Sequence, residues 1–199
     1  MMGTAEGVMA RFRWGMIHGR FQPFHQGHLT YLREALSRSD LLLVGITNPD
    51  PSTIVVEEAD PQRHRPEANP FTFHERLRMV KETLMDERID LRRVDIIPFP
   101  VHHRDLWAYY VPSGTVQFIR VFSAWGREKV QRLQETGLTV EVLDPGAEKE
   151  ISGDEVRRRM IHGLDWEELV PPAVARMIHA IHGVERLRQI IAQGEHVLP

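Results

Sequence analysis

The chain has 199 residues, of which 42% are hydrophobic and 27% charged, as in a globular protein with one sizeable core. It contains no cysteine, which excludes disulfides, thiolate zinc sites and cysteine nucleophiles. The net charge of −3 creates no positive field for nucleic acid, and no apolar run approaches the roughly 18 residues of a membrane span. We expect a cytoplasmic protein without nucleic-acid or membrane partners, with a lead-in over residues 1–13 and a single domain over residues 14–193.

The first half of the chain alternates between apolar runs, typical of buried strands, and segments with helical periodicity. These patterns predict strands over residues 14–18, 41–46 and 94–98 and helices over residues 26–39 and 72–85. Residues 48–69 contain four prolines and many charges without periodicity, which predicts a long loop. Such a loop either closes over a substrate through Arg63, His64 and Arg65 or is simply a polar connection.

The second half continues the alternation and then becomes helical. We expect strands over residues 115–122 and 138–143, a helix over 128–135, and C-terminal helical segments over 152–161, 165–169 and 173–193. Strands that alternate with helices favour a parallel sheet covered on both faces. The predicted fold is therefore α/β, with a Rossmann-like parallel sheet of about five strands flanked by helices and a helical C-terminal segment.

A glycine- and histidine-containing segment, GRFQPFHQGH, lies at residues 19–28 between the first strand and the first helix. Gly19 allows the backbone to approach a phosphate, and the following helix offers free N–H groups and a positive dipole end. His25 and His28, on either side of Gly27, can face the same anion. Spacing alone leaves three interpretations open: a phosphate site, a turn with histidine caps, and a zinc-binding histidine pair.

This segment resembles the signature of the HxGH nucleotidylyltransferase superfamily, in the form found in archaeal-type nicotinamide mononucleotide adenylyltransferases. Two further blocks follow in the family order, NPFTFHER at residues 69–76 and ISGDEVRRRM at residues 151–160. Residues 165–172 and 183–186 match the C-terminal helices of that family. The resemblance spans about residues 15–187 and implies transfer of a nucleoside monophosphate from a Mg²⁺-bound nucleoside triphosphate, with release of pyrophosphate.

The resemblance also implies roles for individual residues. His25, His28 and Arg157 would be the catalytic residues, because phosphoryl transfer needs positioned donors around the α-phosphate rather than a covalent nucleophile. The residues expected to bind the nucleotide are Gly19, Arg20, Phe21, Gly27, Ser152 and Gly153. No set of protein ligands for a metal is predicted, so Mg²⁺ would be carried mainly by the triphosphate.

The third block predicts how its helix begins. Ser152 is a good N-cap, and Glu155 completes a capping box, so the helix end can present N–H groups to phosphates. Asp154 replaces the threonine that is usual in the family. Its carboxylate either helps to hold Mg²⁺ or only caps the helix.

The middle of the chain departs from the adenylyltransferase pattern, and the resemblance implies that the acceptor and the base are selected there. Residues 97–107 read IPFPVHHRDLW in place of an IPDxN-like stretch, and residues 123–127 replace a pair of asparagines. Trp107 is either the residue that stacks on the acceptor or a core aromatic. The residues His102, His103 and Arg104 form either a cationic pocket for a small anionic acceptor or a solvated loop.

Three functions therefore remain in view. The preferred one is a CTP-dependent cytidylyltransferase acting on a phosphonate such as phosphonoformate, because phosphonate cytidylyltransferases of this superfamily look similar to the chain. The alternatives are a nicotinamide mononucleotide adenylyltransferase and a non-catalytic nucleotide-binding sensor. The sequence leaves open whether the base is that of CTP or ATP, and whether the protein forms a homo-oligomer.

Overall fold

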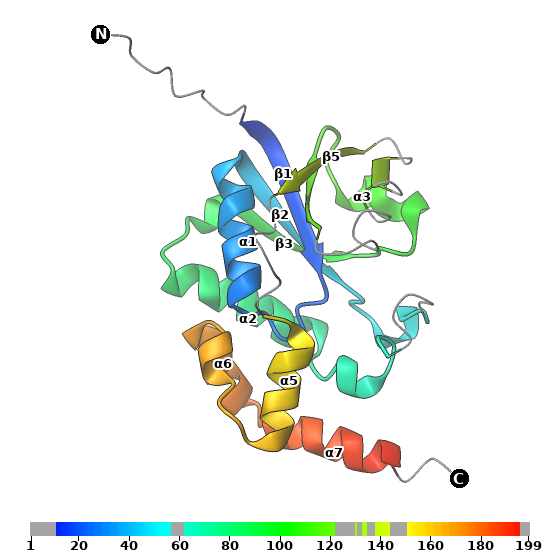
Figure 1. Ribbon diagram of the computed structural model, residues 1–199. Helices are drawn as coiled ribbons and strands as arrows, with labels where there is room; N and C mark the ends of the chain where they lie inside the picture. The colour runs from blue at the N-terminus through cyan, green and yellow to red at the C-terminus, as the bar shows by residue number, and fades with distance from the viewer. Residues whose placement is uncertain are drawn as a thin grey trace.

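The computed structural model describes residues 11–56, 62–121, 130, 133–134, 138–143 and 151–195. Its regular elements alternate along the chain as expected (Figure 1). The strands are β1 (Phe12–Gly19), β2 (Ser39–Thr47), β3 (Val94–Phe99), β4 (Val116–Arg120) and β5 (Thr139–Leu143). The helices are α1 (Gln26–Ser37), α2 (Phe73–Asp86), α3 (Trp107–Tyr110), α5 (Gly153–His162), α6 (Pro172–Ala180) and α7 (Gly183–Glu195).

The five strands form one parallel sheet in the order β3-β2-β1-β4-β5. The chain therefore builds outward from β1 in one direction, through β2 and β3, and then in the other, through β4 and β5. The direction reverses at the boundary between β1 and β4. Open α/β sheets bind ligands at such a boundary, beyond the carboxyl ends of the strands.

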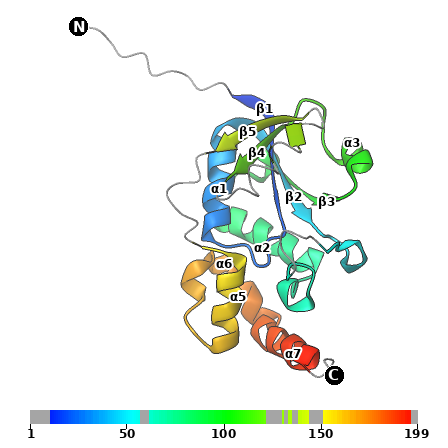
Figure 2. The same cartoon turned by 45° about the vertical axis from the view of Figure 1, so that its right-hand side comes forward.

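Alternating residues of β1 and β2 divide the core between the two faces of the sheet. One face carries Ile17 and Val44, which pack with buried residues of α1, α2, α5, α6 and α7. The other face carries Met16 and Leu43, which pack with Phe99, Trp107, Ile119 and Leu133. In Figures 1 and 2, α5, α6 and α7 lie together at the end of the sheet where β1 leads into α1.

The expected sheet is confirmed, with small shifts at the ends of elements. The first helix ends at Ser37, and Ser39 opens β2, where its buried hydroxyl donates to the Ala35 carbonyl at 2.9 Å. The predicted loop contains short 3₁₀ turns at Pro51–Thr53 and Pro66–Ala68. The short helix α3 was not expected. Of the helix predicted over 128–135, only residues 130, 133 and 134 are described, and they are helical.

The prediction of one continuous helix over residues 173–193 is wrong. The segment forms α6 and α7, separated at His182, whose φ of 52° lies in the left-handed region. Gly183 then approaches its neighbours so closely that an added Cβ would lie 3.0 Å from the Phe71 ring and 3.1 Å from Ile178. The helical periodicity of the sequence continues through this position, but close packing against Phe71 of the second block turns the chain here. None of the helices in the described residues is both long and apolar enough to cross a membrane.

Candidate active site

The turn after β1 is shaped by Gly19 and Phe21. Phe21 has a φ of 53° and is buried, and its ring lies 3.1 Å from where a Cβ on Gly19 would be. A side chain at residue 19 would collide with this ring, so glycine allows the turn to fold back. The Phe21 ring meets His28 edge-on at 4.9 Å between centroids. Its side chain therefore supports the histidine from the core.

The two histidines lie together at the first turn of α1. His25 is the N-cap residue, and its ring stacks on that of His28 with the centroids 3.6 Å apart. His28 Nδ1 accepts a hydrogen bond from the His25 backbone N–H at 3.3 Å, which assigns the proton of the neutral His28 ring to Nε2. A Cβ on Gly27 would lie 3.2 Å from the His25 ring. The H-x-G-H spacing thus places two imidazoles side by side at a positive helix end.

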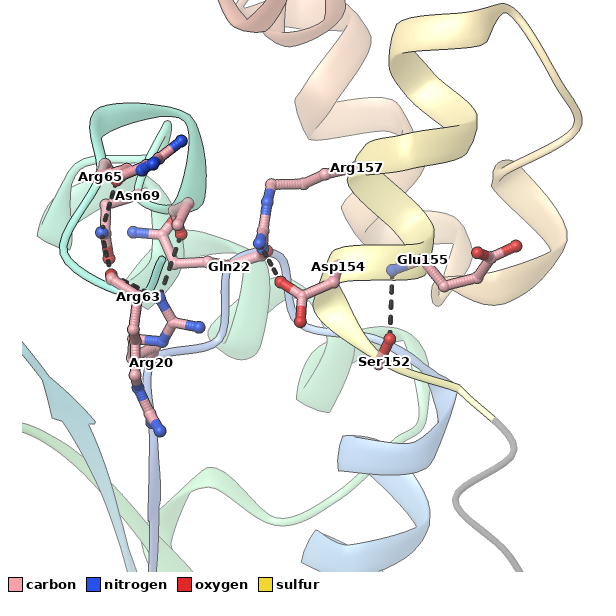
Figure 3. Close-up of polar contacts among 10 residues, drawn as sticks. Arg20, Gln22, Arg63, Arg65, Asn69, Ser152, Asp154, Glu155 and Arg157 are labelled. Atoms are coloured by element: carbon pink, nitrogen blue, oxygen red, sulfur yellow. Dashed lines mark hydrogen bonds and ion pairs between the residues drawn. The ribbon is translucent and has the colours of Figure 1, made fainter. Parts of the chain in front are cut away.

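The third block meets the first block directly. Ser152 is the N-cap of α5, and its Oγ accepts a hydrogen bond from the Glu155 backbone N–H at 3.1 Å. The buried Arg157 side chain reaches back and donates to the Gln22 carbonyl in the turn after β1 (Figure 3). A Cβ on Gly153 would lie 3.0 Å from that carbonyl oxygen, so glycine permits the contact. Two helix N-termini and one buried guanidinium converge here, an arrangement suited to anionic phosphates.

Only half of the predicted capping box is present at Ser152. The Glu155 carboxylate does not return to the Ser152 backbone. It binds Arg158 and Arg159, each at 2.8 Å, and these guanidinium groups lower its pKa to about 2. Asp154 also has an arginine partner, because its carboxylate pairs with Arg157 while its own side chain remains 74% exposed.

Residues 16–159 match the cytidylyltransferase-like family. The chain belongs to that family.

Two relatives that are similar over most of the chain are both nucleotidyltransferases. The chain is 45% identical over 174 residues to a phosphonoformate cytidylyltransferase of Streptomyces viridochromogenes, covering 87% of this chain and 95% of that protein. It is 35% identical over 178 residues to a nicotinamide-nucleotide adenylyltransferase of Saccharolobus solfataricus, covering 89% and 96%. The chain is accordingly a nucleotidyltransferase, and the interpretation as a non-catalytic sensor is set aside.

A solved structure confirms the Rossmann-like fold. A bifunctional NMN adenylyltransferase/ADP ribose pyrophosphatase from Francisella tularensis, complexed with AMP and a manganese ion, superimposes with a TM-score of 0.67 at 17% identity. The match covers 94% of this chain and 54% of that one.

Arg20 lies against the loop over residues 62–69 rather than beside Arg157 (Figure 3). Its Nη1 donates to the carbonyls of Arg63, at 3.0 Å, and Ala68, at 3.4 Å. Asn69 holds the same loop, donating to the carbonyls of Arg63 and Arg65 at 2.9 and 3.0 Å. Figure 3 shows this group next to Gln22, which lies between it and the start of α5. Arg20, in the turn after β1, therefore holds the loop over residues 62–69 against that turn.

The predicted acceptor residues follow β3 on the second face of the sheet. His102, His103 and Arg104 are exposed. Trp107 is only 8% exposed, its ring lies 5.4 Å from that of Phe99, and its indole N–H donates to the Pro100 carbonyl at 3.0 Å. In this conformation Trp107 has the contacts of a core aromatic. The substituted segment at residues 123–127 lies outside the described residues.

The sequence did not indicate the role of Arg76 in the second block. Its guanidinium is buried and donates to the carbonyls of Arg20 and Thr47 at 2.8 Å, of Asn48 at 2.7 Å and of Thr72 at 3.2 Å. Burial and the nearby Arg20 lower its pKa to about 10, so it stays charged at neutral pH. This one side chain joins the carboxyl ends of β1 and β2 to the start of α2.

Gln22 completes the link between the first and second blocks. Its side-chain amide donates to the Phe71 carbonyl and accepts from the Phe71 N–H, both at 2.9 Å. Its backbone carbonyl meanwhile receives Arg157. A signal was present in the sequence, since a polar glutamine between phenylalanine and proline in a buried turn requires partners.

Proposed function

We propose that the protein is a CTP-dependent cytidylyltransferase that transfers CMP to a small phosphonate such as phosphonoformate and releases pyrophosphate. The observation that carries the proposal is the 45% identity to a phosphonoformate cytidylyltransferase, against 35% and 37% for two nicotinamide-nucleotide adenylyltransferases. The departures from the adenylyltransferase pattern at residues 97–107 point the same way.

The triphosphate would lie where the first and third blocks meet. His25 and His28 donate to the oxygens of the α-phosphate, and Arg157 with the N-terminal N–H groups of α5 binds the β- and γ-phosphates. Arg20 adds positive charge from the loop side of the turn. All these donors are positioned before the substrate binds, which favours charge developing in the transition state.

The acceptor would bind beyond the carboxyl ends of the strands, beside the loop that follows β3. His102, His103 and Arg104 provide positive charge for its carboxylate and phosphonate, and Trp107 supports this loop from the core. An ionised acceptor oxygen attacks the α-phosphorus in line. The bond from phosphorus to the bridging oxygen of pyrophosphate breaks, and that oxygen leaves with the electron pair. No enzyme nucleophile is required, because the acceptor is already an anion.

A divalent cation, with Mg²⁺ proposed, would accompany the triphosphate. Among the residues described, no cluster of three or more histidine or acidic side chains could hold a metal by itself. This suits Mg²⁺, which is commonly held by substrate phosphates and one or two carboxylates. The carboxylate of Asp154 is paired with Arg157 at this place, so the proposal does not require it as a ligand of the ion. The ion would neutralise charge on the leaving pyrophosphate.

The proposal is tested by measuring pyrophosphate release for CTP, ATP, GTP, UTP and dCTP against phosphonoformate, phosphonoacetate, phosphoenolpyruvate and nicotinamide mononucleotide. We expect the largest kcat/KM for CTP with a small phosphonate acid. Conversion of nicotinamide mononucleotide and ATP at about 10⁴ M⁻¹s⁻¹ or more, with no turnover of phosphonates, would establish the adenylyltransferase function instead.

A further inference from the structure

Gln22, in the turn after β1, contacts the second and the third block of the site at once. The residue is only 4% exposed. Its side-chain amide donates to the carbonyl of Phe71 and accepts from the N–H of the same residue, each at 2.9 Å. An amide has its donors on one side and its acceptor on the other, so bonds from both sides to one residue allow the side chain a single orientation. The position of Gln22 is therefore fixed relative to Phe71, which lies 49 residues later.

Phe71 is a firm anchor for this amide, because α7 packs on its ring and α2 begins directly after it. The ring is buried, and the guanidinium carbon of Arg186 lies 5.9 Å from its centre. Thr72, the next residue, is the N-cap of α2. Its Oγ1 accepts from the Glu75 N–H at 3.3 Å, and the Glu75 carboxylate accepts from the Thr72 N–H at 2.9 Å. The Phe71 backbone therefore lies between a packed ring and a capped helix, and Gln22 is bound to a rigid part of the fold.

The backbone carbonyl of Gln22 accepts a hydrogen bond from Arg157, which reaches it from α5 (Figure 3). Arg157 is 7% exposed, and its guanidinium also pairs with Asp154 of its own helix. A guanidinium is planar and rigid, so an acceptor at a defined position determines the direction of the whole group. Any residue at position 22 has this carbonyl, but the direction of the carbonyl depends on how the residue is held. The side-chain bonds to Phe71 therefore act on Arg157 through the backbone of Gln22.

The same short segment leads into the two histidines. Gln22 precedes His25, the N-cap of α1, by three residues, and the ring of Phe24 stacks on that of His28 with the centroids 5.6 Å apart. A shift at Gln22 would change the distance between Arg157 and the histidine pair, because the guanidinium follows the carbonyl and the histidines belong to α1. A misplacement of about 1 Å can lower a rate by about 10²-fold. The amide of Gln22 is thus either a structural tie between the blocks or the group that sets the catalytic geometry.

We propose that Gln22 is a positioning residue for the transfer reaction. Its side-chain amide fixes the backbone carbonyl that orients Arg157 toward the triphosphate site formed with His25 and His28. Gln22 itself touches no substrate, and its effect on the reaction passes through Arg157. This inference rests on the proposed function for the roles of His25, His28 and Arg157, and it is independent of the base and of the acceptor.

The test is a double-mutant cycle between Gln22→Met and Arg157→Met, read as the Kd of a Mg²⁺-bound nucleoside triphosphate measured by calorimetry. The nucleotide is the one that binds the wild-type protein most tightly. Methionine is unbranched and similar in length to glutamine, but it lacks the amide. We expect Gln22→Met to raise the Kd by about tenfold in the wild-type background, as for a weakened hydrogen bond to a charged group. In the Arg157→Met background the same change should raise the Kd by less than about twofold.

Turnover supplies a second readout, in which kcat and KM separate. The kcat of Gln22→Met should fall by up to about 10²-fold, as for a misplaced catalytic group, and the acceptor KM should change little. Gln26→Met is the matched control, because Gln26 is a partly buried glutamine of the same block that donates to a distant backbone carbonyl, that of Val170, at 3.2 Å. It should leave both the Kd and kcat close to the wild-type values. Gln22→Asn keeps the amide on a shorter side chain and replaces Gln22→Met in the cycle if the latter does not fold.

An equal rise of the Kd in the wild-type and Arg157→Met backgrounds would overturn the inference, because the amide would then act on the fold and not through Arg157. Unchanged Kd and kcat in Gln22→Met would overturn it as well, and so would the failure of both Gln22 variants to fold. The failure of the proposed function is distinguished by measurements on the wild-type protein alone, which would then bind no triphosphate or release no pyrophosphate.

Discussion

Arg157 in α5 donates a hydrogen bond to the carbonyl of Gln22, a residue 135 positions earlier in the turn after β1. The same guanidinium is paired with Asp154, one turn back along α5. The backbone carbonyl fixes the position of the arginine, and the carboxylate offsets its charge. On the proposed function, an incoming phosphate would compete with Asp154 for Arg157.

This competition predicts the effect of Asp154→Thr, which introduces the residue usual in the family. We expect the Kd of CTP, measured by calorimetry with Mg²⁺ present, to fall several-fold, because Arg157 no longer has an internal anion. Glu155→Gln is the control, since it removes a charge from the same turn but frees Arg158 and Arg159. Equal gains in both variants would indicate a general charge effect. A weaker affinity in Asp154→Thr would contradict the competition and favour a role for Asp154 in holding the cation.

A second prediction concerns the stacked histidines. His25→Ala and His28→Ala should each lower kcat by about 10²–10³-fold, equivalent to roughly 2.7–4 kcal/mol, as when one donor to a developing oxyanion is removed. The KM of the acceptor should change little. His74→Ala, an exposed histidine of α2, serves as the control and should leave kcat unchanged. Near-native turnover in either site variant would refute the catalytic assignment.

The features that the sequence predicted are those formed by residues close to one another along the chain. The H-x-G-H turn, the Ser152 cap and the alternation of strands and helices each occupy a continuous segment. Parallel strands have their carboxyl ends at the same edge of a sheet, so the sequence predicted only that the segments after these strands lie near one another. The resemblance could therefore associate Arg157 with His25 and His28, but not specify the Gln22 carbonyl that positions Arg157.

Other features depend on partners far away in the sequence. Arg76 binds backbone carbonyls, which every residue possesses, so no side-chain pattern reveals its four partners. His18 and Gln117 are 99 residues apart, and each appears as an isolated polar residue in an apolar run. The break between α6 and α7 was missed because helical periodicity continues through His182, and tertiary packing of Gly183 decides the turn.

The position of Arg76 predicts a large loss of stability on substitution. Arg76→Met should lower the free energy of unfolding by about 3 kcal/mol or more, because several buried carbonyls lose their donor at about 1–3 kcal/mol each. Arg76→Lys should recover part of this loss, since an ammonium retains the charge but lacks the planar fork. Urea unfolding measures both. Arg78→Met on the exposed side of α2 is the control, with a change within about 0.5 kcal/mol. A similarly small change in Arg76→Met would contradict the bridging role.

The last prediction concerns the attachment of α7 to the second block, which depends on pH through Glu75. The Glu75 carboxylate accepts hydrogen bonds from both terminal nitrogens of Arg186, at 2.9 and 3.1 Å, and from the Thr72 N–H at 2.9 Å. Burial acts to raise the pKa of Glu75, but the hydrogen bonds from Arg186 and Thr72 prevail and lower it.

A carboxyl whose pKa is lower in the folded state stabilises the fold above the pKa of the unfolded chain, near 4.3, and this stabilisation is lost as the pH falls through the folded pKa. Glu75→Gln should therefore be less stable than the wild type at pH 7, and the difference in free energy of unfolding should shrink as the pH falls below about 4. Urea unfolding at several pH values measures this difference. Glu82→Gln, which removes an i,i+4 pair with Arg78 on the surface of the same helix, should show a smaller difference at pH 7. A gap for Glu75→Gln that stays constant between pH 7 and pH 3 would show that packing of the side chain, and not its charge, holds α7 against α2.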